Sequence, residues 1–481
     1  MRARMRWAMI AAAGGIVGDG GARALAQCLP IELRAGDTTR NNEFYGCAVA
    51  LSGDTMIVGA RAAATVPGVY GGAAYIYRRS GTTWTLEQRI KGNDTEAGDE
   101  FGISVAIRGD VAIVGAYLDD DAGSGSGAAY VFRRSGTTWT QEAKLTASDA
   151  AAGDRFGTSV AIDGDTAIVG APFTFIVGFQ TGTAYVFRRQ GQSWTETQRL
   201  NAPVLEAGAF FGGFITLDGD VAVFSAIAED SPGLIDAGAV YVYRRSGEAW
   251  PLEKRIVPSD HAAGQAFGSA VSLRNGALLI GSYQDDGPGG VDQGSAYVFR
   301  NAGTAWTQEA KVRATDGAAA DFYGAAVSIS ADAAIIGAYQ RDATGTVVTA
   351  DAGMAYLLRR RPGGQWYDAG RATLAMPMPQ DYFASAVAID GPFAVGGCLN
   401  RDGPTTNAGA AYVIDLASCA CDANCDASTG SPVLNVADFV CYLNRFAAAD
   451  PYANCDGSTT APVLNVADFV CFLNKFAGGC G

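Results

Sequence analysis

Oxygen-bearing side chains alternate along a short segment near the end of the chain. Asp422, Asn424 and Asp426 stand two residues apart, so their oxygens can point at one hard cation. Asn435 and Asp438 follow, and Asn435 can cap a predicted helix whose first turn carries Asp438. Because carboxylate and amide oxygens are the ligands that calcium prefers, this segment predicts a calcium site.

A second copy of this pattern begins 30 residues later. Asn454, Asp456, Asn465 and Asp468 repeat the ligands, but Tyr452 stands where the first copy has its first acid. We therefore expect the first loop to bind calcium more firmly than the second. In both copies, apolar residues at helical spacing follow the last acid, enough for a small two-helix core. The alternative is a small domain that is stabilised by disulfides and binds no metal.

Residues 419–481 resemble a dockerin, the duplicated half-EF-hand module of cellulosomal proteins, in the form that ends in Gly-Cys. That resemblance places the five ligands of the first copy at loop positions one, three, five, nine and twelve. The chain departs from the family in having about five extra residues before Pro432 and Pro462, and in carrying Ala427 where the second copy has Gly457. The resemblance implies a cohesin-like or cell-surface protein partner that binds at residues 419–481.

The start of the chain predicts export. Residues 1–6 are basic, residues 7–17 are mostly apolar, and Ala24-Leu25-Ala26 forms a small-residue cleavage site, so residues 1–26 read as a signal peptide. No later stretch is long and apolar enough to span a membrane. We therefore expect a secreted protein, extracellular or at the cell surface.

The cysteines fit an exported chain. All 10 follow the predicted cleavage site, and an even number in an exported protein favours disulfides. Internal symmetry suggests the pairs Cys425–Cys441 and Cys455–Cys471, although exchange between the copies is equally symmetric. Cys28 could pair with Cys419 or Cys421, and the connectivity stays open.

Six tryptophans recur at a nearly fixed interval before this module. Their spacings are 55, 55, 56, 56 and 60 residues, which is too long for a helical solenoid and suits a four-stranded β-propeller blade. They are Trp84, Trp139, Trp194, Trp250, Trp306 and Trp366.

One repeat shows the expected strands. Residues 104–107, 111–116 and 128–133 are apolar runs, whereas 139–145 alternates in polarity as a half-exposed outer strand does. This order of strands begins seven times along the chain, each time after an aromatic residue. These residues are Tyr45, Phe101, Phe156, Phe211, Phe267, Tyr323 and Phe383. The last unit lacks its fourth strand, and residues 29–37 resemble the missing strand, so we predict that the N-terminal segment completes blade seven and closes the ring.

The repeated phrase Phe-Gly, Ser-Val-Ala-Ile, Ile-Val-Gly-Ala resembles the FG-GAP repeat of the integrin α-subunit propeller, in its short bacterial form, over residues 29 to about 418. The resemblance implies an all-β, seven-bladed propeller at 27–418, followed by the small α-helical, EF-hand-like module at 419–481. The calcium loop that integrin-type repeats often carry is reduced here to a turn such as Arg108-Gly109-Asp110, so calcium is not expected in the blades.

The two faces of such a propeller should differ in charge. We name the face with the connections between strands one and two and between three and four the turn face, and the opposite one the loop face. The turn face carries Arg78, Arg79, Arg133, Arg134, Arg188, Arg189, Arg244, Arg245, Arg359 and Arg360. The loop face carries Asp119, Asp120, Asp121, Glu229, Asp230, Asp285 and Asp286. Either this acidic face binds a cation or a basic or sugar-like partner, or its loops are merely solvated.

An apolar loop at residues 172–179 stands apart on that face. It either contacts a partner or folds over the mouth of the tunnel.

Catalytic signals are weak. The single histidine, His261, lies in a loop, and the predicted inner strands 104–107, 159–162 and 270–273 carry no carboxylates for acid–base chemistry. A net charge of −14 disfavours nucleic-acid and anionic-membrane binding. We therefore expect no enzyme but a non-catalytic binding, structural or adhesion propeller, with an unidentified ligand at the loop face and a calcium-dependent tether. The alternative is an extracellular carbohydrate-active enzyme, a polysaccharide hydrolase or lyase, with the same tether.

The calcium site yields the first prediction. Asp426→Ala removes a ligand from the firmer loop, so calorimetric titration of the protein with calcium should lose its stronger site. A protein without any calcium response would contradict the dockerin assignment.

Overall fold

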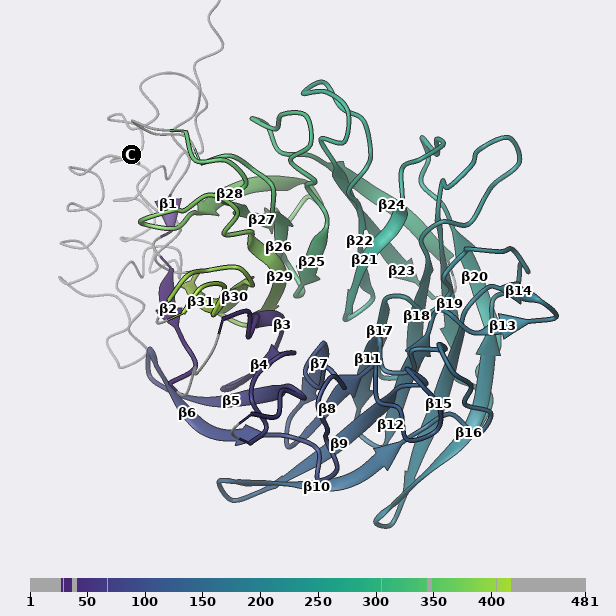
Figure 1. Ribbon diagram of the computed structural model, residues 1–481. Coiled ribbons are helices and arrows are strands. Elements are labelled where there is room, and N and C mark those ends of the chain that lie inside the picture. Colours follow the sequence, from purple (N-terminus) through teal and green to yellow (C-terminus); the bar gives the residue numbers. More distant parts are fainter. Residues whose placement is uncertain are drawn as a thin grey trace, which may run out of the picture. The chain divides into compact units, whose positions relative to one another are not determined.

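Seven blades stand around a common axis, and each is built on four antiparallel strands (Figure 1). This computed structural model describes residues 27–28, 30–36, 41–66, 68–303, 305–343, 348–403 and 405–416. The predicted all-β, seven-bladed propeller is confirmed, and the strands of blade two lie within two residues of their predicted bounds. No helix in the described residues is long and apolar enough to cross a membrane.

Each blade places its strands in order from the axis outward. The innermost strands are β3 (Tyr45–Ser52), β7 (Ser104–Arg108), β11 (Ser159–Asp163), β17 (Ile215–Asp218), β21 (Phe267–Arg274), β25 (Ala326–Ile329) and β29 (Phe383–Asp390). The second strands are β4 (Thr55–Ala60), β8 (Val111–Ala116), β12 (Thr166–Ala171), β18 (Val221–Ala226), β22 (Ala277–Ser282), β26 (Ala333–Ala338) and β30 (Phe393–Cys398).

The outer half of each blade continues this order. The third strands are β5 (Ala73–Ser80), β9 (Ala128–Ser135), β15 (Thr183–Gln190), β19 (Ala239–Arg244), β23 (Ser295–Ala302), β27 (Met354–Arg360) and β31 (Ala410–Asp415). The outermost are β6 (Thr83–Ile90), β10 (Thr138–Leu145), β16 (Ser193–Asn201), β20 (Leu252–Ile256), β24 (Ala305–Val312), β28 (Trp366–Ala372) and β2 (Ile31–Leu33).

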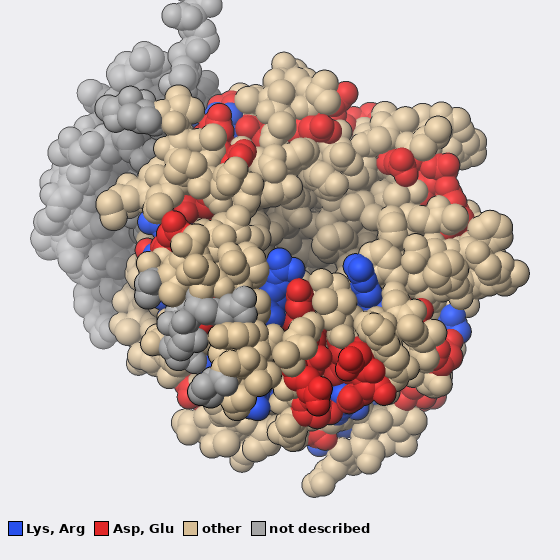
Figure 2. Space-filling model, in the orientation of Figure 1, with Lys and Arg blue, Asp and Glu red and all other residues tan. Residues whose placement is uncertain are grey.

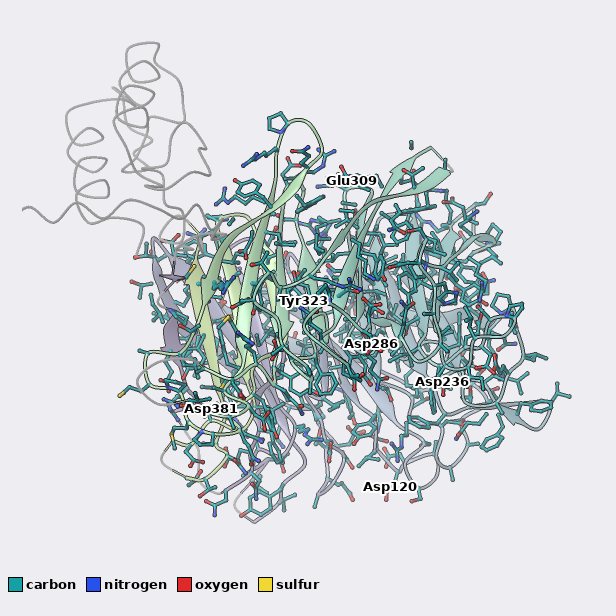
Figure 3. All side chains as sticks on the ribbon, turned by 90° about the horizontal axis from the view of Figure 1, so that it is seen from above. Asp120, Asp236, Asp286, Glu309, Tyr323 and Asp381 are labelled. Carbon is teal, nitrogen blue, oxygen red and sulfur yellow. The ribbon has the colours of Figure 1, made fainter. Side chains whose placement is uncertain are left out.

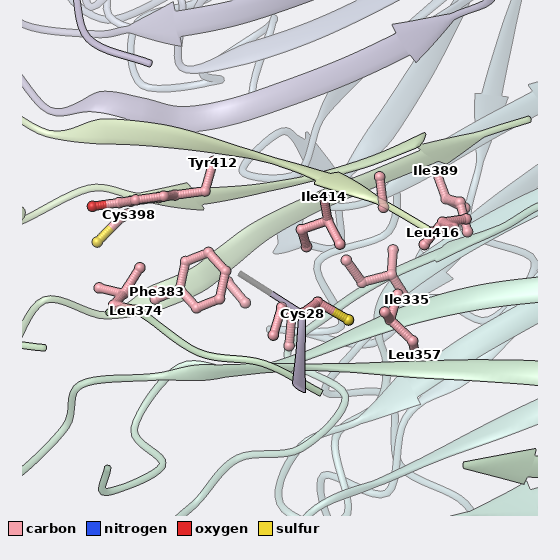
Figure 4. Packing of buried hydrophobic residues seen from close by; sticks show 14 of the residues in the cluster. Cys28, Ile335, Leu357, Leu374, Phe383, Ile389, Cys398, Tyr412, Ile414 and Leu416 are labelled. Atoms are coloured by element: carbon pink, nitrogen blue, oxygen red, sulfur yellow. The ribbon is translucent and has the colours of Figure 1, made fainter. Parts of the chain in front are cut away.

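The N-terminal segment contacts two blades. In β2, Ile31 pairs with Val413 of β31, so β2 is the fourth strand of blade seven. The preceding β1 (Gln27–Cys28) runs parallel to β28 and adds a fifth strand to blade six, where Cys28 pairs with Ala372. The sequence analysis assigned residues 29–37 to the missing strand of blade seven and did not foresee that the preceding residues join blade six. Cys28 is buried there in an apolar cluster with Ile335 and Phe383 (Figure 4).

Neighbouring blades touch backbone to backbone near the loop face. A Cβ added to Gly59 of β4 would lie 2.0 Å from the carbonyl oxygen of Gly102 in the next blade, which no side chain tolerates. The same contact recurs at five further interfaces. They are Gly115 with Gly157, Gly170 with Gly212, Gly281 with Gly324, Gly337 with Ala384, and Gly397 with Gly46. The repeated glycine of the second strand therefore sets how closely the blades pack.

Ion pairs link neighbouring blades at the turn face. Glu142 of β10 accepts hydrogen bonds from Arg133 of its own blade, at 2.8 Å, and from Arg189 of the next blade. Glu309 of β24 likewise accepts from Arg300 at 3.0 Å and from Arg360 of the next blade at 2.7 Å. The sequence analysis did not match these arginines to acidic partners. Five of the ten predicted arginines pair with glutamates, namely Arg133, Arg134, Arg189, Arg244 and Arg360, and Arg79 and Arg245 pair with aspartates.

Two cysteines of the propeller are free thiols. The Cys47 Sγ donates to the carbonyl oxygen of Gly102 at 3.4 Å, and the Cys398 Sγ donates to that of Asp381 at 3.1 Å. Both face backbone oxygens rather than each other, although they belong to neighbouring blades. The suggested disulfides of the C-terminal module lie outside the described residues.

The bridging glutamates predict acid-sensitive stability. Burial alone would raise the pKa of Glu142, but hydrogen bonds from Arg133 and Arg189 outweigh it and hold the pKa below its ordinary value of 4.5. A lowered folded-state pKa contributes stability that is present above pH 4.5 and is lost as the pH falls through the folded-state pKa. Glu142→Gln should lower the free energy of unfolding at neutral pH by about 1–2 kcal/mol and reduce its loss on acidification. Denaturant titrations at several pH values measure both.

The control is Glu248→Gln, because Glu248 is exposed and forms no ion pair with a described residue. Equal effects of the two substitutions would contradict the bridging role of Glu142.

Candidate functional site

Every residue of the predicted calcium site lies outside the described residues. These are Asp422, Asn424, Asp426, Asn435, Asp438, Asn454, Asp456, Asn465 and Asp468. The signal peptide at 1–26 and the docking surface at 419–481 also lie outside them. Calcium binding and docking therefore stay predictions. In the described part of the chain, no three His, Cys, Asp or Glu side chains gather as a metal site.

The loop face is acidic in the structure, but its acids are of two kinds. Asp120 lies toward one end of the propeller and Glu309 toward the other, with Asp286 and Asp236 between them (Figure 3). Acidic side chains gather in several patches on the loop face (Figure 2). Whether these acids are free to bind a ligand depends on their partners.

The predicted acids of the loop face occur next to one another in the sequence. The first acid of each such group is buried, with hydrogen-bond and ion-pair partners inside the protein. Asp119 accepts the hydroxyl of Tyr130 at 2.8 Å and pairs with Lys144 at 2.9 Å. Glu229 accepts from Tyr241 at 2.6 Å and from Arg255 at 2.8 Å. These carboxylates hold the blade together and are not available to a ligand.

Asp285 follows the same rule, since it is buried and pairs with Lys311 at 2.7 Å and with Arg313. By contrast, among the acids predicted for the loop face, Asp120, Asp230 and Asp286 are exposed and without a cationic partner in the described residues.

A ring of strained residues opens the seven inner strands at the loop face. The residue before each opening aromatic has a positive φ of 52–56°, in the left-handed region that ordinary side chains avoid. They are Phe44, Glu100, Arg155, Phe210, Ala266, Phe322 and Tyr382. Such strain costs on the order of 1–3 kcal/mol per residue and persists only where the surrounding structure enforces it. The repeat therefore places seven side chains of different types at equivalent positions around the tunnel mouth.

Four aromatic rings form a continuous chain over blades five to seven, which we name the aromatic arc. Ring centroids lie 5.4 Å apart for Tyr283 and Phe322, 5.8 Å for Phe322 and Tyr339, and 5.8 Å for Tyr339 and Tyr382. All four side chains are half-buried, so each keeps part of its ring exposed. Figure 2 shows the loop face hollowed around the axis. The arc therefore offers stacking surface beside an open depression.

Charged and aromatic side chains alternate over blades one to three, which we name the charged arc. Arg61 pairs with Glu100 at 3.1 Å, and its guanidinium lies 4.7 Å from the ring centroid of Phe44. The guanidinium of Arg155 lies 4.5 Å from the centroid of Phe173. Cation–π contacts of this kind fix the position of each arginine while leaving donors for a ligand.

One part of the apolar loop at residues 172–179 faces the tunnel mouth, and another part is exposed to solvent. Phe173 turns toward the mouth, where its ring lies 5.3 Å from that of Phe210. Phe175, Val177 and Phe179 instead form an exposed hairpin, β13 (Phe175–Ile176) and β14 (Phe179–Gln180). The loop therefore contributes one residue to the mouth and leaves its tip in solvent.

The tunnel runs along the axis between the inner strands. Inner strands of all seven blades line a cavity of about 230 Å³, with apolar side chains apart from serine, threonine and a few charged residues. Arg108 reaches across to Asp218, two blades away, at 3.0 Å, and Arg274 reaches Asp390 at 3.3 Å. These pairs neutralise the charges at the turn-face end, so the tunnel holds no free acid or base among the described residues.

The tyrosines around the mouth are held in their protonated form. Burial is the main cause that raises the pKa of Tyr117, Tyr283, Tyr339 and Tyr382, so these phenols stay protonated at neutral pH. His261 donates from Nε2 to the carbonyl oxygen of Gly238 at 2.9 Å, which fastens one loop to another. The arrangement can stack, donate and accept hydrogen bonds, which is the chemistry of a binding surface.

The sequence analysis missed both arcs. Their residues share no side-chain type, and only their place directly before the Phe-Gly phrase, or directly after the second strand, marks them. These positions can be located in the sequence, but the sequence does not predict their positive φ.

Comparison with known proteins agrees with this architecture. The model of the FG-GAP repeat matches residues 32–77, 84–132, 139–187, 194–243, 250–299 and 306–358. Each matched segment joins the outer strand of one blade to the inner strands of the next. No curated protein matches the chain.

Proposed function

Because this chain belongs to the FG-GAP repeat family, we propose that it is an exported, non-catalytic propeller with a binding or adhesion role. Its ligand would dock at the loop-face mouth, between the aromatic arc and the charged arc. FG-GAP membership and the propeller fold are consistent with such a role, but fold alone does not specify it. The proposal therefore rests on the mouth.

The aromatic arc is the observation that carries this proposal. Four half-buried rings from three blades are held in fixed contact, so little conformational entropy is lost when a ligand stacks on them. Arg61, Glu100 and Arg155 across the mouth supply donors and an acceptor for a polar ligand. A ligand with a flat or ring-shaped face and several hydroxyl groups, such as a sugar, fits this combination.

The tether and the ring closure belong to the same proposal. We propose that residues 419–481 bind calcium and attach the propeller to a cohesin-like or cell-surface partner, on the strength of the repeated ligand pattern. The pairing of β2 with β31 supports closure of the ring by the N-terminal segment after removal of residues 1–26.

A carbohydrate-active enzyme is the second candidate. Exposed acids such as Asp120 and Asp286, together with the mouth tyrosines, are the groups that such an enzyme could use. Against it stand the raised pKa values of those tyrosines and the neutralised charges of the tunnel. Both candidates act on carbohydrates at the same face, so a single experiment separates them.

The purified protein should bind one or more polysaccharides from a mixed pool without cleaving them. Tyr339→Ala and Tyr382→Ala each remove a ring from the aromatic arc, so affinity should fall about tenfold in affinity electrophoresis. Reducing ends released by the wild-type protein measure cleavage in the same samples.

Tyr367→Ala is the matched control, because Tyr367 lies in β28 near the turn face and stacks with Arg361. Unchanged binding by both arc variants would overturn the mouth as the ligand site. Reproducible cleavage that is lost in Asp120→Asn, Asp286→Asn or an arc variant would establish the enzyme instead.

A further inference from the structure

The hairpin of blade three presents apolar side chains to solvent on a rigid base. Thr174 and Thr181 are buried, the backbone of Thr174 accepts from the N–H groups of Thr181 and Gly182, and the Thr174 hydroxyl lies 2.7 Å from that of Thr183. Above this base, Phe175 is 64% exposed, Val177 84% and Phe179 50%. Figure 1 shows β13 and β14 at the outer edge of the ring. The tip is therefore held in place without any cover from the described residues.

Val177 has both an unfavourable backbone conformation and an exposed apolar side chain. Ile176 pairs with Phe179, so Val177 and Gly178 form a two-residue turn, with φ values of 51° and 87°. Asparagine and glycine are favoured in such turns, whereas a β-branched residue with positive φ is strained. Val177 is also the most exposed of the large apolar residues in the described chain. Neither packing nor backbone preference explains valine here, which points to a role outside the fold.

Neighbouring loops extend the apolar surface. The N–H of Gly208 donates to the carbonyl oxygen of Gln180 at 2.8 Å, which joins the hairpin to the loop that carries Val204 and Leu205. Glu206 of that loop accepts the N–H of Asp230 at 2.9 Å, which joins it to the loop that carries Ile235. Val204, Leu205 and Ile235 are 42%, 50% and 68% exposed. We name these three residues together with Phe175, Val177 and Phe179 the hairpin patch.

Unneutralised acids border the hairpin patch. Glu206, Asp230 and Asp236 lie on the same two loops, and no described lysine or arginine pairs with them. Burial raises the pKa of Glu206, and the neighbouring charges of Asp230 and Glu229 raise it further. An apolar surface with an acidic border is complementary to a partner that is apolar at its centre and basic around it.

We propose that the hairpin patch docks a protein segment that carries apolar residues interspersed with lysine or arginine. An anionic membrane would be repelled by the acidic border and by the net charge of −14. A second copy of this chain would bring the same acids against each other across a symmetric interface. The surface is distinct from the aromatic and charged arcs, so the proposal does not depend on a carbohydrate ligand.

The test uses a short fluorescent peptide of alternating leucine and lysine, with a leucine–glutamate peptide as its charge control. The full-length protein should bind the lysine peptide in anisotropy titrations, more weakly at high salt, and should not bind the glutamate peptide. Val177→Asn should weaken binding about tenfold while leaving the thermal midpoint unchanged or higher, because asparagine suits the turn. This variant therefore separates binding from folding.

Val66→Asn makes the same substitution at an exposed valine in the corresponding loop of blade one, and should bind as the wild type does. Tyr339→Ala should also leave peptide binding unchanged, which distinguishes this proposal from the carbohydrate site. Equal binding of both peptides, or wild-type affinity in Val177→Asn, would overturn the proposal. So would binding to phosphatidylserine vesicles, or self-association in sedimentation, that disappears in Val177→Asn.

Discussion

The close approach of neighbouring backbones is the constraint on which the rest of the propeller depends. At six interfaces the second-strand glycine faces a carbonyl oxygen of the next blade at a distance that excludes even a methyl group. The interface of blades four and five departs from this rule, because Ser225 stands in place of the glycine, and its hydroxyl accepts the N–H of Phe214 within its own blade. At this one interface a serine with a hydrogen bond inside its own blade takes the place of the glycine.

Polar side chains link neighbouring blades at both faces of the propeller. At the turn face, glutamates such as Glu142 bridge arginines of two blades. At the loop face, Asp149 and Asp260 accept a tyrosine hydroxyl and pair with a cation of the next blade. Partly buried pairs with well-formed hydrogen bonds contribute more than exposed ones, and the repeat adds them around the ring. These paired charges therefore belong to the scaffold of the propeller.

The regular part of the molecule could be predicted from the sequence because it is repeated. The tryptophan interval and the apolar runs report strands, and strand burial recurs in every blade. The partners of single acids could not be predicted, because Asp119 and Asp120 are adjacent and identical, yet only Asp119 points to Tyr130 and Lys144. The mouth was missed for a related reason: Phe44, Glu100 and Arg155 share a backbone conformation, which composition does not report.

Strain and exposure together separate function from scaffold in this repeat. The positive φ of the mouth residues recurs in all seven blades, so the fold itself enforces it, and only the choice of side chain varies. The positive φ of Val177 occurs in one loop, at a position where the turn favours asparagine and solvent favours a polar residue. Strain that the repeat imposes explains architecture, whereas strain confined to one blade and left uncovered needs a partner to explain it. By that argument the backbone and the side chains of the blade-three hairpin are both specific to this protein. At the mouth the backbone is common to all blades, and only the side chains of the two arcs are specific.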